Sequence, residues 1–158
     1  MVELNNMIPG AIDFCIRETT GFSTADEVIN ALKSGNLLLN SKLRQSIARD
    51  VAGYLSEKFG SRIKGARLYG STAEYNACVY SDIDIVFLLT ELPENFRQVI
   101  ADMDKILSES YYRLLEKNES DWSYLLDIHV INEDPYVQRH PSMAYLEHIF
   151  MNGSVAVN

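Results

Sequence analysis

The sequence feature that most constrains the fold of this chain is a pair of aspartates at the start of its most apolar run. Asp82 and Asp84 are followed directly by the apolar residues 85–89, with the sequence IVFLL. A continuous apolar run of this length predicts a β-strand that is buried on both faces. Side chains alternate along a strand, so Asp82 and Asp84 are expected to share one face while Ile83 points to the other.

Two carboxylates held this close repel each other, and without a partner one of them tends to take up a proton. A divalent cation resolves the conflict, and hard oxygen ligands suit Mg²⁺ or Mn²⁺, which keep positions open for water and phosphate. A third carboxylate, Asp127, interrupts the later apolar run YLLDIHVI. If that strand pairs beside the first, Asp82, Asp84 and Asp127 converge into a two-metal site for phosphoryl chemistry.

A glycine-serine pair, Gly70 and Ser71, ends another predicted strand, RIKGARLYG. Glycine allows the backbone to approach a phosphate closely. The N–H groups of a turn that opens into a helix bind anions, and the Ser71 hydroxyl adds one more donor. The sequence therefore predicts a nucleotide held by its phosphates at this turn, above metal ions bound by the aspartates.

Helix signals flank these strands. The expected helices run from Thr24, which has capping-box spacing to Glu27, to Gly35; over residues 41–60; over Pro93–Lys117; and from Pro141 to Gly153. Residues 1–23 show no clean helical period. The resulting order of helices and strands predicts an α/β (α+β) domain with a small sheet. A weak boundary near residues 36–40 separates an N-terminal helical extension (1–40) from the main domain (41–158), although the extension can equally be part of the same domain.

Composition narrows the functional classes. The 158 residues carry a formal net charge of −8, which argues against general nucleic-acid binding, because such proteins present a basic face to phosphates. Cys15 and Cys78 have no metal-like spacing and are expected to be reduced thiols in a cytoplasmic protein. We find no secretory signal and no apolar stretch of membrane-spanning length.

Together these motifs resemble the DNA polymerase β-like nucleotidyltransferase superfamily, and most of all its minimal nucleotidyltransferase branch. That family's pattern is an apolar residue, Gly-Ser, about ten residues, and then Asp-apolar-Asp. Here it is Tyr69-Gly70-Ser71, residues 72–81, and Asp82-Ile83-Asp84. The resemblance covers roughly residues 41–132. It implies a mixed sheet flanked by helices and transfer of a nucleotidyl group from a nucleoside triphosphate.

The resemblance also implies roles for the site residues. Asp82 and Asp84 would bind both metals, and Asp127 would hold the catalytic metal and help deprotonate the acceptor hydroxyl. Ser71 would contact the triphosphate. Many family members place Arg three residues after the Ser, followed by Gly, whereas this chain has Glu74 and Tyr75 there. A Glu repels a triphosphate, so another base is expected to supply the charge; the candidates are Arg62, Lys64 and Arg67.

Two functions are compatible with this sequence. The first is an enzyme that transfers AMP, or another nucleotidyl unit, from an NTP, with ATP the expected one, to a hydroxyl on a small molecule or a protein. The second is an antitoxin-like protein that acts by binding a small helical toxin, with weak or no catalysis; a homodimer is another possible assembly. His129 shares the Asp127 face and either touches the site or, as is commoner, is held by ordinary core hydrogen bonds.

Overall fold

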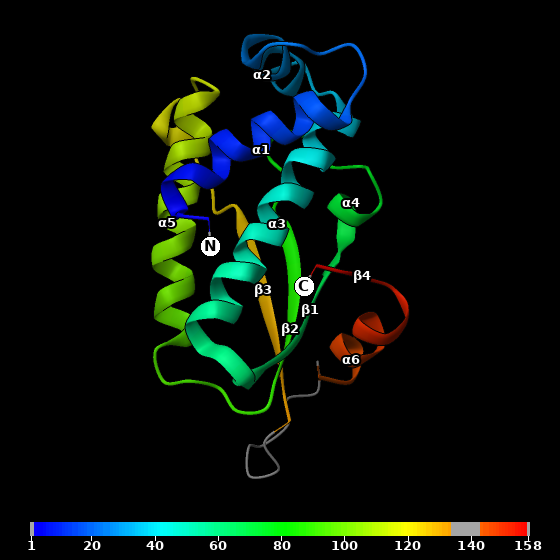
Figure 1. Cartoon of the computed structure of the whole chain (residues 1–158), viewed down its shortest axis with the longest axis vertical. Coiled ribbons are helices and arrows are strands. Elements are labelled where there is room, and N and C mark those ends of the chain that lie inside the picture. The colour runs from blue at the N-terminus through cyan, green and yellow to red at the C-terminus, as the bar shows by residue number, and fades with distance from the viewer. Residues whose placement is uncertain (1, 134–142, 158) are drawn as a thin grey trace.

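The structure is a computed structural model, and it describes residues 2–133 and 143–157 (Figure 1). Its elements, in chain order, are α1 (Leu4–Glu18), α2 (Ala25–Lys33), α3 (Leu37–Phe59), the 3-10 turn η1 (Gly60–Arg62), β1 (Ile63–Tyr69), α4 (Gly70–Ala73), β2 (Ile83–Leu89), α5 (Phe96–Leu114), the 3-10 turn η2 (Glu119–Asp121), β3 (Leu126–Asn132), α6 (Met143–Asn152) and β4 (Val155–Ala156). Over these described ranges, no helix is both long and apolar enough to cross a membrane.

The four strands form one sheet in the order β3-β2-β1-β4. Strand β2 runs antiparallel to β1 and parallel to β3, and β4 is antiparallel to β1. The sheet is therefore mixed and flanked by helices, as the sequence and the family resemblance predicted. The parallel β2–β3 pair is joined through α5, as a parallel connection requires.

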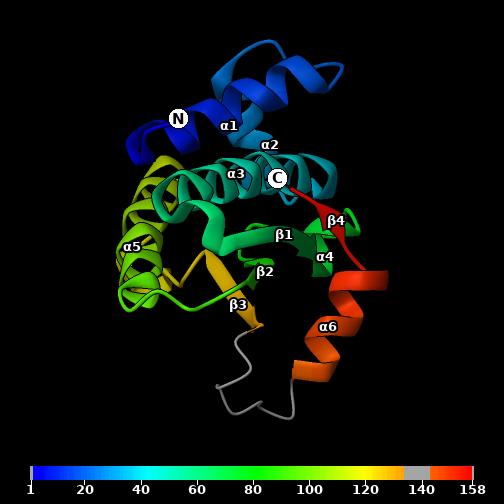
Figure 2. The same ribbon diagram turned by 60° about the horizontal axis from the view of Figure 1, so that its bottom comes forward.

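Helices cover both faces of this sheet, but unequally. Figure 2 shows α3 and α1 stacked on one side of the strands and α6 on the other. Ile83, Ile85 and Phe87 point into the large core on the first side, while Val86 packs with Leu146 of α6 on the second. The central strand is thus buried on both faces, which explains its unbroken apolar run.

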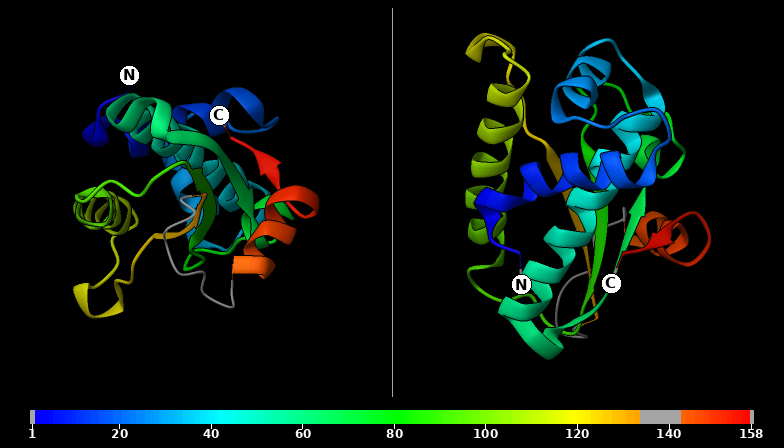
Figure 3. Two further views of the ribbon diagram at one scale, coloured as in Figure 1. Left: turned by 90° about the horizontal axis from the view of Figure 1, so that it is seen from below. Right: turned by 45° about the horizontal axis from the view of Figure 1, so that its top comes forward.

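Residues 1–23, whose sequence shows no clean helical period, contain a helix. Helix α1 spans Leu4–Glu18 and buries five residues at helical spacing: Met7, Ile8, Ala11, Ile12 and Cys15. Pro9 lies inside this helix, next to Gly10, and these two poor helix formers hid the period. Burial against α3 and α5 (Figure 3) offsets their cost. Helices α1, α2 and α3 share the main core. The domain boundary near residues 36–40 stays a prediction.

Three further boundaries differ from expectation. Helix α3 begins at Leu37, before residue 41, because the Asn36 side chain accepts a hydrogen bond from the Leu39 N–H at 3.0 Å and caps the helix. Helix α5 begins at Phe96, since Pro93 lies in the preceding turn. Strand β3 begins at Leu126, after the turn η2, whereas the apolar run YLLDIHVI that predicted it begins at Tyr124. Pro141, the expected start of the last helix, lies outside the described residues.

Candidate active site

Three aspartates meet at the end of the sheet that carries α4, the upper end in Figure 1. Asp84 of β2 is directly paired with Asp127 of β3 in the parallel register, and Asp82 immediately precedes β2. One carboxylate oxygen from each of the three lies within 4.8 Å of the other two. All three side chains are half-buried. The pairing of the two aspartate-bearing strands, on which the predicted convergence of the three carboxylates depends, is therefore present.

The electrostatics of this triad favour a cation. Burial, the charge of Asp82 and a hydrogen bond with Asp127 raise the pKa of Asp84 to about 7. Burial and the charge of Asp127 also raise the pKa of Asp82. The pKa of Tyr69, the β1 residue paired with Asp84, is raised by burial and by the same carboxylates. The site therefore holds more negative charge than its surroundings stabilise, which a bound divalent cation would relieve.

This excess charge predicts that the metal-free protein loses stability as the pH rises from about 4 to 7. The pKa of Asp84 is higher in the folded than in the unfolded state, so the folded state binds more protons across this window and the slope of stability against pH is negative. Because the side chain is partly exposed, we expect a loss of about 1–2 kcal/mol, well below the full linkage value. Urea unfolding at pH 4.5 and pH 8 measures it.

Adding excess Mn²⁺ at pH 8 is expected to reverse that loss, since a cation that binds the ionised triad stabilises the folded state by mass action. Wild-type protein whose stability rises steadily between pH 5 and 8, with no gain from Mn²⁺, would contradict the assigned charge cluster.

The Gly70 turn lies directly against the triad. Gly70 has φ +72°, and a Cβ built on it would lie 2.3 Å from the Asp84 Oδ2 atom. No side chain fits there without moving the Asp84 carboxylate, and only glycine adopts this φ without strain. Ser71, the next residue, is the second residue of the single-turn helix α4, and its carbonyl accepts a hydrogen bond from Asn76 N at 2.8 Å. The turn and the carboxylates therefore lie side by side, and their joint role in binding a nucleotide and metal stays a prediction.

Position 75, where many family members have glycine, keeps a glycine-like backbone. Tyr75 has φ +60°, in the left-handed region, and its side chain is 50% exposed. Left-handed backbone costs a non-glycine residue roughly 1–2 kcal/mol, and the half of Tyr75 that is buried offsets only part of that cost. Glu74, at the position of the family's Arg, is exposed.

Tyr75→Gly is expected to stabilise the protein by about 0.5–1 kcal/mol, because relief of the left-handed strain outweighs the added flexibility of the unfolded chain. Tyr75→Ala is the matched control, since it removes the ring but keeps the strain. Thermal unfolding distinguishes them: equal melting temperatures for the Gly and Ala variants would show that the backbone is not strained.

His129 touches the site, although the commoner alternative for it was a histidine held by core hydrogen bonds. Its Nε2 lies 3.2 Å from the Asp127 Oδ1, and both side chains are more than a third exposed. The alternation along β3 places both residues on one face. His129 can therefore donate a hydrogen bond to Asp127 and orient its carboxylate.

The basic residues suggested for the triphosphate lie elsewhere. Arg62 is paired with Glu91 at 2.9 Å, and Lys64 is exposed at the beginning of β1, the end opposite Gly70. Arg67 is closer, but its Nε donates to the Ser154 hydroxyl at 2.7 Å and its guanidinium lies over the Phe150 ring. None of the three contacts the Gly70 turn in the part of the chain that the structure describes.

Asp104, which sequence reasoning missed, fixes the start of β3. Its Oδ1 accepts hydrogen bonds from the backbone N–H groups of Leu125 and Leu126, both at 2.8 Å, directly before Asp127. Ser108 of the same helix donates to that oxygen. The only available signal was a carboxylate four residues before a serine on the helix α5, which is too common a pattern to identify a function.

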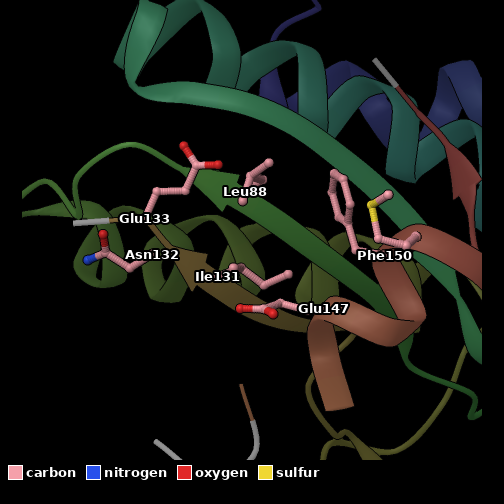
Figure 4. Close-up of a pocket in the computed structure, with 7 residues that line it drawn as sticks. Leu88, Ile131, Asn132, Glu133, Glu147 and Phe150 are labelled. Carbon is pink, nitrogen blue, oxygen red and sulfur yellow. The ribbon is translucent and has the colours of Figure 1, made fainter. Parts of the chain in front are cut away.

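One pocket lies away from the triad. It has a volume of about 590 Å³ between the ends of β2 and β3 and the helix α6 (Figure 4), and it is lined by Leu88, Ile131, Asn132, Glu133, Glu147, Phe150 and Met151. Leu88 follows Asp84 by four strand residues, or about 13 Å. The buried contact of Val86 with Ile131 and Leu146 lies between, so this pocket is not the carboxylate site.

A small mixed sheet with three converging carboxylates beside a glycine turn is an arrangement that suits phosphate and metal chemistry. The chain matches the family model of the nucleotidyltransferase domain over residues 48–149. It therefore belongs to the nucleotidyltransferase domain family, and the resemblance to the polymerase β-like superfamily is confirmed. No curated protein matches the chain significantly.

Proposed function

We propose that this protein is a metal-dependent nucleotidyltransferase that moves a nucleoside monophosphate, AMP by preference, from an NTP to a hydroxyl acceptor. The observation that carries the proposal is the register of β2 and β3, which pairs Asp84 with Asp127 beside Asp82. A chain of the nucleotidyltransferase family has a direct use for three carboxylates converging in this way.

The triad fits a divalent cation of the Mg²⁺ or Mn²⁺ type. Its donors are hard oxygens, and burial together with the neighbouring carboxylates raises the pKa of Asp82 and of Asp84, so cation binding would relieve a repulsion already present. Asp82, Asp84 and Asp127 would hold the metal. When bound, such ions neutralise phosphate charge and lower the pKa of an attacking hydroxyl.

The chain's own residues supply binding and orientation. The Gly70 turn leaves space for a phosphate to approach the backbone, and the Ser71 hydroxyl is its nearest side-chain donor in sequence. Asp127 would accept the proton of the acceptor hydroxyl, and His129, whose Nε2 lies 3.2 Å from the Asp127 Oδ1, would hold that carboxylate in place. The acceptor is a hydroxyl on a small molecule or a protein.

A second candidate is an antitoxin-like protein that binds a small helical partner and has little or no activity. Glu74 supports it, because an exposed carboxylate stands where the family's Arg would neutralise the triphosphate. We place either function in the cytoplasm, a reducing compartment that suits Cys15 and Cys78, both of which are free thiols.

Incubation of the protein with labelled ATP, Mn²⁺ and cell lysate tests the proposal. Transfer of label from the α-phosphate, but not from the γ-phosphate, to a product is expected for an enzyme. Absence of transfer with all four NTPs, together with co-purification of a helical protein, would favour the binding function.

A further inference from the structure

Arg44 of α3 is fully buried, with 0% of its surface exposed. A buried guanidinium is costly unless all its donors are satisfied, and it has five N–H groups. Five hydrogen bonds meet them: Nε donates to Ser81 O at 2.8 Å, Nη1 to two oxygens of Asn40, and Nη2 to Val79 O and the Tyr111 hydroxyl. Each N–H group of the buried guanidinium therefore has an acceptor.

The contacts of Arg44 converge on the loop that leads into the carboxylate site. Ser81 immediately precedes Asp82, and Val79 lies two residues earlier. The Tyr111 hydroxyl, which accepts from Arg44, also donates to Val79 O at 2.6 Å. One side chain from α3 and one from α5 therefore hold the same short backbone segment, 79–81, from the buried side.

A purely structural role would be the simpler explanation, since a buried, satisfied arginine stabilises many cores. One observation argues for more. The oxygens that Arg44 binds at Ser81 and Val79 belong to backbone outside any helix or strand. The path of the chain into Asp82 therefore depends on the side-chain contacts that Arg44 and Tyr111 make with this loop.

We propose that Arg44 is a positioning residue for the metal site: held by Tyr111, it fixes the backbone of residues 79–81 and so aims the Asp82 carboxylate at Asp84 and Asp127. This inference rests on the proposed function. Lysine cannot replace the arginine, because three donors on a flexible stem cannot meet five acceptors in a fixed fork.

The test compares Arg44→Lys and the milder Tyr111→Phe with wild type, using the full chain. Mn²⁺ affinity is measured by calorimetry, and amide hydrogen exchange is followed over residues 76–83 in the metal-free protein. We expect Mn²⁺ affinity to fall roughly tenfold for Arg44→Lys, as losses of outer-shell partners of metal ligands do. Tyr111→Phe should give a smaller loss in the same direction, and exchange in the segment should be faster in both.

Leu55→Ala is the matched control, because Leu55 is also fully buried on α3 but lies three turns further along the helix. It should lower the thermal stability but not change the Mn²⁺ affinity. The exchange of residues 76–83, compared with the rate of global unfolding, should also stay as in wild type. The proposal is overturned if Mn²⁺ affinity survives in both variants, or if Leu55→Ala weakens it as much for the same loss of stability. Wild-type protein that binds no Mn²⁺ would instead overturn the proposed function.

Discussion

Asp84→Asn is expected to abolish nucleotidyl transfer without destabilising the metal-free protein. The amide keeps the shape of the side chain and can still donate a hydrogen bond to Asp127, but it cannot contribute negative charge to a cation. Removing one preorganised group from a charge-stabilising site costs roughly 10²–10³-fold in rate, and loss of a metal ligand should cost at least that. Measured with labelled ATP, activity should fall to background.

The stability of the same variant provides a second readout. Asp84 ionises in wild type only against burial and the charge of Asp82, which is why its pKa lies at about 7. An asparagine does not ionise. The free energy of unfolding of the variant should therefore equal that of wild type at pH 4.5 and exceed it by about 1–2 kcal/mol at pH 8. Mn²⁺ should no longer add stability.

Asp13→Asn is the control for this substitution, because Asp13 is an exposed carboxylate on α1, outside the site. It should change neither transfer nor the response to Mn²⁺. Transfer at the wild-type rate by Asp84→Asn would show that the assigned site is wrong. If Asp84→Asn lost transfer but still bound a helical partner, catalysis and binding would be shown to be separate properties of the fold.

The triad could be predicted from the sequence because it depends on local rules. The period of two along a strand places Asp82 and Asp84 on one face, and an aspartate that interrupts a second apolar run is conspicuous. The register that pairs Asp84 with Asp127 is a long-range property of two strands that the helix α5 separates in sequence, and sequence spacing alone does not determine it.

The supporting residues could not be predicted for a different physical reason. Arg44 and Asp104 act on backbone groups of loops distant in sequence, and such contacts leave no periodic trace. Arg44 did give a weak signal, because it lies four residues after Asn40 and before Ala48, on the side of α3 that is buried. A polar residue on an apolar stripe indicates a buried network. Helix α1 was not predicted because Pro9 and Gly10, which disfavour helix, interrupt the apolar stripe that the helix buries.

Gly70→Ala is expected to damage the site more than the fold. Any residue with a side chain is strained at φ +72°, which costs about 1–2 kcal/mol, and the added methyl would overlap Asp84 Oδ2 at 2.3 Å. The Asp84 carboxylate must therefore turn away from Asp82 and Asp127, or the turn must move away from the strand. Calorimetry should show Mn²⁺ and Mn²⁺-ATP affinity reduced by at least tenfold, while unfolding stays cooperative.

Gly35→Ala separates the two causes, because Gly35 has a similarly positive φ of +86° but nothing within 4 Å of an added Cβ. It carries the same kind of backbone strain without the contact with a carboxylate. Its thermal stability should fall about as far as that of Gly70→Ala, and its metal and nucleotide affinities should remain at wild-type values. If both variants bind Mn²⁺-ATP as wild type does, the Gly70 turn is not part of the nucleotide site. If both lose affinity together, strain in the fold explains the loss, and the close approach of Gly70 to Asp84 does not.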